Sequence, residues 1–139
     1  MPDLALLQIN ELRTEFSSLV NHAEYIEFKV IKGGCMDGLR LYSVMNNAQD
    51  IFVYIFPEID VEAGEYITLH LQTFNKFDSC DELRDDLTIS GGDGACPSAR
   101  DLWVTGNDKL IDKTCIVYIQ DINGKIMDAV FLNEKPAGA

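Results

Sequence analysis

A β-hairpin near the end of the chain places the tightest constraint on the fold. Two apolar runs within Thr114 to Asn133 flank Asn123-Gly124, which favours a type I′ turn because both residues tolerate positive φ. One face of each run suits burial. These faces consist of Cys115, Val117 and Ile119, then Ile126, Asp128, Val130 and Leu132. A lone hairpin is barely stable in water, so the sequence requires further strands to cover it.

Short apolar runs upstream, separated by Gly, Pro and Asn turn signals, predict those strands. They lie at residues 4–12, 24–32, 39–44, 51–56, 66–73 and 102–104. The run 51–56 is apolar on both faces, which predicts a fully buried strand or one whose second face meets a partner. After residue 12, helical spacing makes a short helix up to residue 20 the competing interpretation. About seven strands predict an all-β, immunoglobulin-like antiparallel sandwich of two sheets.

Residues 75–100 break this pattern, because they are acidic, rich in glycine and too long for an ordinary hairpin loop. Loops of this length are usually functional or mobile. Ser79-Cys80-Asp81-Glu82 fits a capping box, so a short helical turn is predicted over residues 80–87.

Length and charge bound the remaining possibilities. The 139 residues fit one domain, at 4–133, followed by a tail or linker stub at 134–139. A formal charge of −12 repels phosphate backbones, so a nucleic-acid partner is not expected. No apolar run approaches the ~20 residues that span a bilayer, and the start of the chain as given lacks the features of a signal peptide. An unknown protein or a glycan remains as the partner.

The four cysteines form no metal-binding spacing. Cys80 and Cys96 lie in one polar segment and could form a disulfide, although free thiols are equally compatible with the sequence. Cys115 alternates with apolar residues and is predicted to be a small buried hydrophobe.

Carboxylates of the 75–100 loop are the weak candidates for a metal site. They are Asp78, Asp81, Glu82, Asp85, Asp86 and Asp93. Ca²⁺ binds six to eight oxygens in flexible geometry, but the spacing lacks the run of an EF-hand. A solvated acidic loop is the preferred interpretation, and no cofactor is expected.

Two histidines, His22 and His70, are the usual neutral-pH bases. A Cys/His hydrolase would need Cys80 or Cys96 to lie near His70. The preferred interpretation is that His70 is an exposed strand residue alternating with inward leucines, and that His22 lies in a turn. No catalytic residue is therefore assigned. Trp103 and several tyrosines could line a glycan or protein contact, although strand aromatics more often fill a core.

Several short motifs occur in the order that one known family uses. They are Leu7-Gln8-Ile9-Asn10-Glu11, Glu24-Tyr25-Ile26-Glu27-Phe28, Asp37-Gly38-Leu39-Arg40-Leu41-Tyr42, Ala63-Gly64-Glu65-Tyr66, Asn107-Asp108, Val117-Tyr118-Ile119-Gln120-Asp121 and Gly124-Lys125-Ile126-Met127-Asp128-Ala129-Val130. This order resembles the lamin-tail domain family, an immunoglobulin-like sandwich of nuclear lamins and many bacterial exported proteins. Leu41-Tyr42 replaces the tryptophan usual in its third strand, and the 75–100 loop is longer than is typical.

The resemblance implies a non-catalytic accessory domain that mediates protein or surface attachment, in an extracellular or periplasmic location. Two alternatives remain. The first is an adhesion module that Ca²⁺ stabilises through the 75–100 loop, and the second is the Cys/His-dependent hydrolase. Asp128, on the last predicted strand, is expected to hydrogen-bond backbone groups of a neighbouring strand.

Overall fold

Ten strands and no helix make up the part of the chain that the computed structural model describes, residues 3–14, 24–45, 49–71, 81–90, 98–104, 110–111 and 114–133. The strands are β1 (Leu6–Thr14), β2 (Glu24–Lys32), β3 (Gly34–Cys35), β4 (Arg40–Met45), β5 (Ile51–Ile55), β6 (Asp60–Val61), β7 (Tyr66–His70), β8 (Arg100–Trp103), β9 (Thr114–Gln120) and β10 (Ile126–Asn133). The predicted all-β fold is confirmed, and the two-residue strands β3 and β6 account for part of the larger number of strands.

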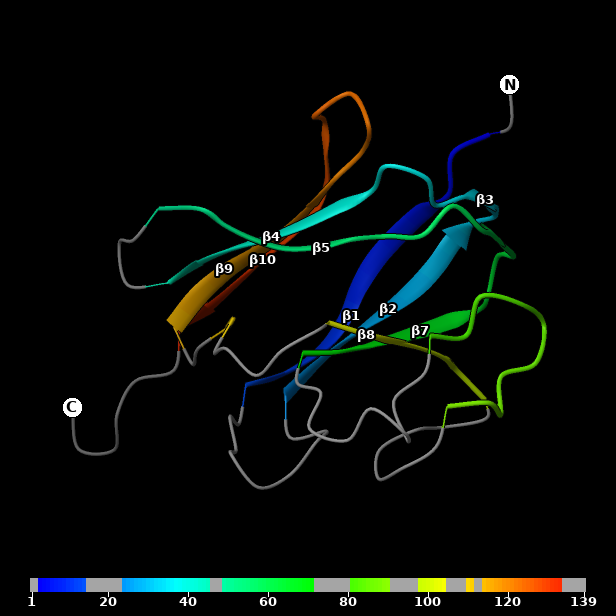
Figure 1. Ribbon diagram of the computed structural model, residues 1–139. Helices are drawn as coiled ribbons and strands as arrows, with labels where there is room; N and C mark the ends of the chain where they lie inside the picture. The colour runs from blue at the N-terminus through cyan, green and yellow to red at the C-terminus, as the bar shows by residue number, and fades with distance from the viewer. Residues whose placement is uncertain are drawn as a thin grey trace.

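Eight of these strands form two four-stranded sheets that face each other (Figure 1). Their neighbour orders are β1-β2-β7-β8 and β10-β9-β4-β5, and β3 pairs with β6. Read along the chain, the sheets follow the A-B-E and G-F-C-C′ orders of an immunoglobulin-like sandwich. One pair departs from the predicted antiparallel arrangement, because β8 runs parallel to β7. The long connection between them provides the crossover that a parallel pair requires.

The core lies between the two sheets and follows the predicted alternation. Ile26, Phe28 and Val30 of β2 are buried, and Phe28 meets Phe56 edge to face at 5.3 Å between ring centroids. The inward face predicted for β9 is confirmed, since Cys115, Val117 and Ile119 are at most 2% exposed. Each large apolar side chain buried in this way stabilises the fold by about 1.5–3 kcal/mol.

The closing hairpin forms as predicted, but its turn is displaced by one residue, and a register shift after Ile126 leaves this side chain 55% exposed in place of the buried position predicted for it. The Gly124 N–H donates to the Asp121 carbonyl at 3.0 Å, so Ile122 and Asn123 are the central residues, and Gly124 follows at φ 81°. The Asp121 carboxylate accepts the N–H groups of Asn123 and Lys125 at 2.9 and 3.0 Å. Aspartate favours the first position of a type I turn for this reason. The type I′ turn predicted at Asn123-Gly124 is therefore wrong.

Two other predicted segments differ from the structure. Strand β5 is the edge of its sheet, with Phe52 and Ile55 52% and 48% exposed. Of the two interpretations of 51–56, the fully buried strand is therefore wrong, and a second face that meets a partner stays a prediction. Residues 81–90 form bends and turns in place of a helical turn, because Asp81 and Glu82 bond to β8. The competing helix up to residue 20 falls mainly on residues 15–23, which lie outside the described residues, as does the tail at 134–139. No helix that could cross a membrane occurs in the described part of the chain.

Candidate functional site

Two carboxylates of the acidic segment, residues 81–90, accept hydrogen bonds from backbone N–H groups at the outer edge of β8. Glu82 accepts the Asp101 N–H at 2.7 Å and the Ser90 N–H at 3.1 Å, and its own N–H donates to the Asp101 carbonyl at 3.0 Å. Asp81 accepts the Trp103 N–H at 2.8 Å. Unpaired backbone groups at a sheet edge invite association with other strands. These side chains therefore take the place of a further strand.

Arg100 fastens the same segment to β7. Its Nη1 donates to the carbonyls of Glu82 and Arg84 at 2.7 and 2.8 Å. Its Nε and Nη2 donate to Glu65 Oε1 at 3.1 and 2.8 Å. Arg100 is 5% exposed, and these charge-assisted bonds compensate for the burial of its charge.

His70 lies beneath this cover, so the exposed position predicted for it is wrong. It is 1% exposed, its Nε2 lies 2.7 Å from Asp101 Oδ1, and its ring stacks on Trp103 at 3.9 Å between centroids. The Trp103 indole N–H donates to the Ser90 hydroxyl at 2.8 Å. His70 Nδ1 makes no hydrogen bond within the part of the chain that the structure describes. Such burial separates the imidazole from any dissolved substrate.

The remaining predicted catalytic and disulfide residues contribute no described geometry. His22, Cys80 and Cys96 lie outside the described residues. Cys35 and Cys115 are buried, which confirms the buried position predicted for Cys115.

Three of the six predicted calcium ligands accept hydrogen bonds. Besides Asp81 and Glu82, Asp86 accepts the N–H and the hydroxyl of Thr88 at 2.9 and 2.5 Å, and these bonds lower the pKa of its carboxyl. Asp85 is exposed, and Asp78 and Asp93 lie outside the described residues. Among the residues whose placement is described, no three His, Cys, Asp or Glu side chains gather where they could hold a metal ion.

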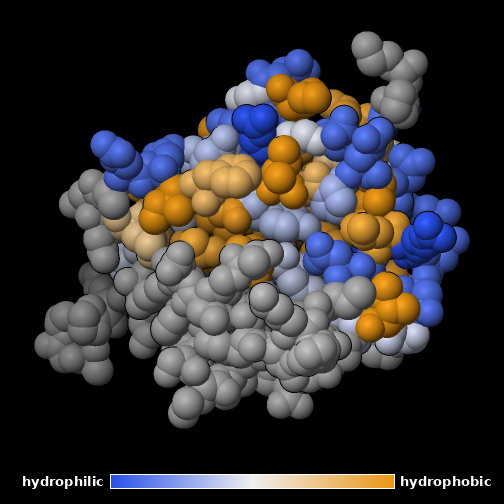
Figure 2. Space-filling view, in the orientation of Figure 1, coloured by the Kyte–Doolittle hydropathy of each residue, from blue (hydrophilic) through white to orange (hydrophobic). Residues whose placement is uncertain are grey.

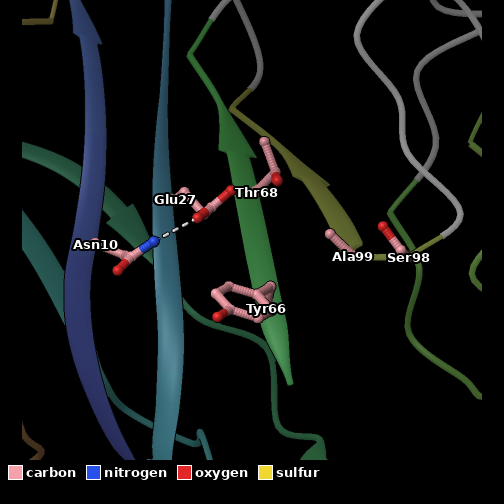
Figure 3. Close-up of a pocket in the computed structure, with 6 residues that line it drawn as sticks. All are labelled: Asn10, Glu27, Tyr66, Thr68, Ser98 and Ala99. Atoms are coloured by element: carbon pink, nitrogen blue, oxygen red, sulfur yellow. Dashed lines mark hydrogen bonds between the residues drawn. The ribbon is translucent and has the colours of Figure 1, made fainter. Parts of the chain in front are cut away.

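A polar hollow of about 310 Å³ opens on the outer face of the β1-β2-β7-β8 sheet (Figure 3). Its lining comes from three strands and the residues before β8. The lining residues are Asn10, Glu27, Tyr66, Thr68, Ser98 and Ala99. From the sequence, Tyr66 was one of several tyrosines that could line a contact, but the polar residues around it were missed, because strand pairing brings them together from distant parts of the chain.

The opposite sheet presents an apolar outer face. Tyr42 and Tyr118 stack at 5.3 Å between centroids near its centre, and Phe52 meets Tyr42 at 5.8 Å. Large apolar side chains that are 38–63% exposed surround them. These are Phe52, Ile55, Ile116, Ile126 and Phe131, and with Tyr42 and Tyr118 we call them the apolar face. In Figure 2, apolar residues gather over β4 and β5.

The strand order and these two surfaces define an immunoglobulin-like β-sandwich domain. Residues 5–139 match the model of the TP_1001_2nd family, described as "protein second domain". The chain therefore belongs to this family of second domains. It is also similar to an uncharacterized protein of Treponema pallidum (strain Nichols), with 35% identity over 131 residues. That match covers 91% of this chain but 31% of the relative, so the chain spans about a third of the relative's length.

Proposed function

We propose that this chain is a non-catalytic interaction domain whose apolar face docks against a protein domain of different sequence. The observation that carries the proposal is the exposure of Phe52, Ile116 and Phe131 on the outer face of one sheet, where Tyr42 and Tyr118 lie between the edge strands β5 and β10. Strand pairing places them together, because Ile116 is opposite Phe131 and Tyr42 is opposite both Phe52 and Tyr118. Contiguous exposed apolar surface of this kind marks interaction sites in soluble proteins.

The net charge of the chain indicates what kind of partner would dock on the apolar face. A net charge of −12 makes two copies repel each other, whereas a partner with a basic rim is attracted. We therefore expect an apolar centre surrounded by Lys or Arg on the docking surface. The context of the family supports a separate domain as the occupant, since the Treponema relative is about three times as long as the matched region.

The lamin-tail resemblance belongs to the same proposal. The A-B-E and G-F-C-C′ strand orders support it, because that family has an immunoglobulin-like sandwich. Attachment to a protein or surface, and an extracellular or periplasmic location, are the roles that the resemblance suggests. Fractionation of cells that produce the protein is the direct measurement of location.

Site-specific photo-crosslinking of the full gene product in its native cell tests the docking. Benzoyl-phenylalanine replaces Phe52 on the apolar face and, in a matched control, the exposed Ile31 of β2 on the opposite sheet. We expect the probe at position 52 to link to a peptide from a different domain, with basic residues near the linked site. Phe131→Ser in the same chain should reduce this product, because it removes the apolar side chain opposite Ile116.

Two results would overturn the docking proposal. One is crosslinking from position 52 that only joins two copies of this chain, together with a dimer in sedimentation equilibrium. The other is equal crosslinking from positions 52 and 31, which would mean that the apolar face has no specific occupant.

A further inference from the structure

We propose that the polar hollow on the β1-β2-β7-β8 sheet is a binding subsite for a neutral sugar residue. It lies on the sheet opposite the apolar face, so the inference goes beyond the docking proposal and does not depend on it.

A bulge in β1 builds one wall of the hollow. Ile9 is opposite Phe28 and Glu11 is opposite Glu27, which leaves Asn10 as the extra residue between them. Bulges re-aim side chains and occur often beside functional sites. Here the Asn10 Nδ2 donates to Glu27 Oε1 at 2.6 Å (Figure 3). This bond fixes an amide and a carboxylate side by side.

Strand β7 contributes two lining residues of the hollow, Thr68 and Tyr66. Thr68 is opposite Glu27, and Tyr66 is opposite Lys29, so the hydroxyl of Thr68 and the ring of Tyr66 are in neighbouring rows of the sheet. Within the described residues, the Thr68 hydroxyl and Glu27 Oε2 make no hydrogen bond, since the Asn10 amide bonds only Oε1. The hollow therefore offers unused acceptors and a hydroxyl beside a partly exposed aromatic ring, all on rigid strands (Figure 3).

This combination fits a neutral polyol better than an ion. Besides the Glu27 carboxylate, the Lys29 ammonium lies near the hollow, 5.9 Å from the centroid of the Tyr66 ring, so charges of both signs are present. One carboxylate already bonded to an amide provides too few oxygens for Ca²⁺, and the charge of −12 disfavours anions.

Adjacent sugar hydroxyls need neighbouring acceptors and donors, and the apolar face of a sugar ring packs on an aromatic side chain. Carboxylate, amide and hydroxyl groups supply the first requirement, and Tyr66 supplies the second. The volume of about 310 Å³ is at the lower end of small-molecule sites. We therefore expect one or two sugar rings, bound weakly because the hollow is open.

Heteronuclear NMR of the whole chain tests the inference. Methyl glycosides of glucose, galactose, mannose and N-acetylglucosamine are titrated separately to millimolar concentrations. At least one should cause saturable shifts of the Asn10, Glu27 and Thr68 amides. Tyr66→Ala should weaken binding about tenfold or more, and Glu27→Gln should weaken it while retaining the size of the side chain. Phe52→Ala on the opposite sheet is the matched control and should bind as the parent does.

Several results would overturn the sugar proposal. These are the absence of saturable shifts with all four glycosides, shifts confined to the apolar face, or unchanged affinity in both Tyr66→Ala and Glu27→Gln. Dispersed amide spectra of each variant establish that it is folded. Because crosslinking from position 52 reports on the other sheet, failure here leaves the docking proposal standing.

Discussion

His70 Nε2 lies 2.7 Å from Asp101 Oδ1, and both side chains are at most 1% exposed. The contact joins neighbouring parallel strands beneath a segment that also pairs with the edge of β8. Because the bond is shielded from water, its loss leaves polar atoms without solvent to replace the missing partner. The contact therefore stabilises the fold.

Asp101→Ala should lower the free energy of unfolding by about 2 kcal/mol, because it leaves a buried imidazole without its acceptor. Urea denaturation followed by the fluorescence of Trp103, which stacks on His70, provides the measurement. Asp85→Ala is the matched control, since Asp85 is exposed, and should change the stability by less than about 0.5 kcal/mol. Equal effects of the two substitutions would contradict the structural role of the pair.

Glu82 links the stability of the same region to pH. Burial raises the pKa of its carboxyl, and the N–H bonds from Asp101 and Ser90 oppose that rise only in part. The folded state thus binds the proton more tightly than the unfolded state, so the stabilisation is full below the unfolded value of 4.5. It is lost as the pH rises through the folded pKa.

Glu82→Gln removes this titration, so the stability of the parent relative to the variant should decrease between pH 4 and pH 7. Urea unfolding of both proteins across that range measures the difference, with Asp85→Asn as the control carboxylate. A difference that stays constant with pH would refute the raised pKa.

Strand alternation could be predicted from the sequence, because inward and outward positions are fixed by local spacing. Ile26, Phe28 and Val30 are buried as expected for this reason. The environment of His70 could not be predicted from the sequence, because the residues that cover it, 81–90 and 98–104, are far along the chain. Alternation correctly placed His70 on the outer face of its strand, but the pattern carries no information about what packs there.

The candidate sites also depend on contacts between distant residues, which local spacing does not predict. Asn10 reads as an outward strand residue, and its approach to Glu27 depends on a bulge that no local motif indicates. The displaced turn has a local cause, since the Asp121 side chain accepts two N–H groups of the loop. The prediction considered only the turn preference of Asn-Gly and therefore missed it. Asp128 was more predictable, since a carboxylate on an inward face needs a donor.

Asp128 connects the edges of the two sheets, accepting the Ile9 N–H at 2.8 Å through Oδ2. The expected bond to a neighbouring strand is confirmed, although the strand belongs to the other sheet. Asp128→Ala should destabilise the protein by about 1–2 kcal/mol and accelerate hydrogen exchange at the Ile9 amide. Asp128→Asn retains an acceptor oxygen and should have a smaller effect. Unchanged exchange at Ile9 in the alanine variant would show that the bond contributes nothing.

Tyr118 and Asp50 form a hydrogen bond on the apolar face, in which the phenol donates to the carboxylate. Desolvation, followed by this bond and the charge of Asp50, raises the pKa of Tyr118 from 10.0 to about 12. Its stabilising contribution is therefore present below pH 10 and is lost as the pH rises through about 12.

Carbon-13 NMR of the tyrosine rings, assigned with Tyr118→Phe, should show Tyr118 protonated at pH 11, well below its pKa of about 12. Asp50→Asn removes the carboxylate charge and should shift the titration part of the way back towards 10.0, because desolvation remains. Asp121→Asn, in the hairpin turn, is the matched control and should leave it unchanged. Titration of Tyr118 near its ordinary pKa in the parent chain would contradict the contact with Asp50.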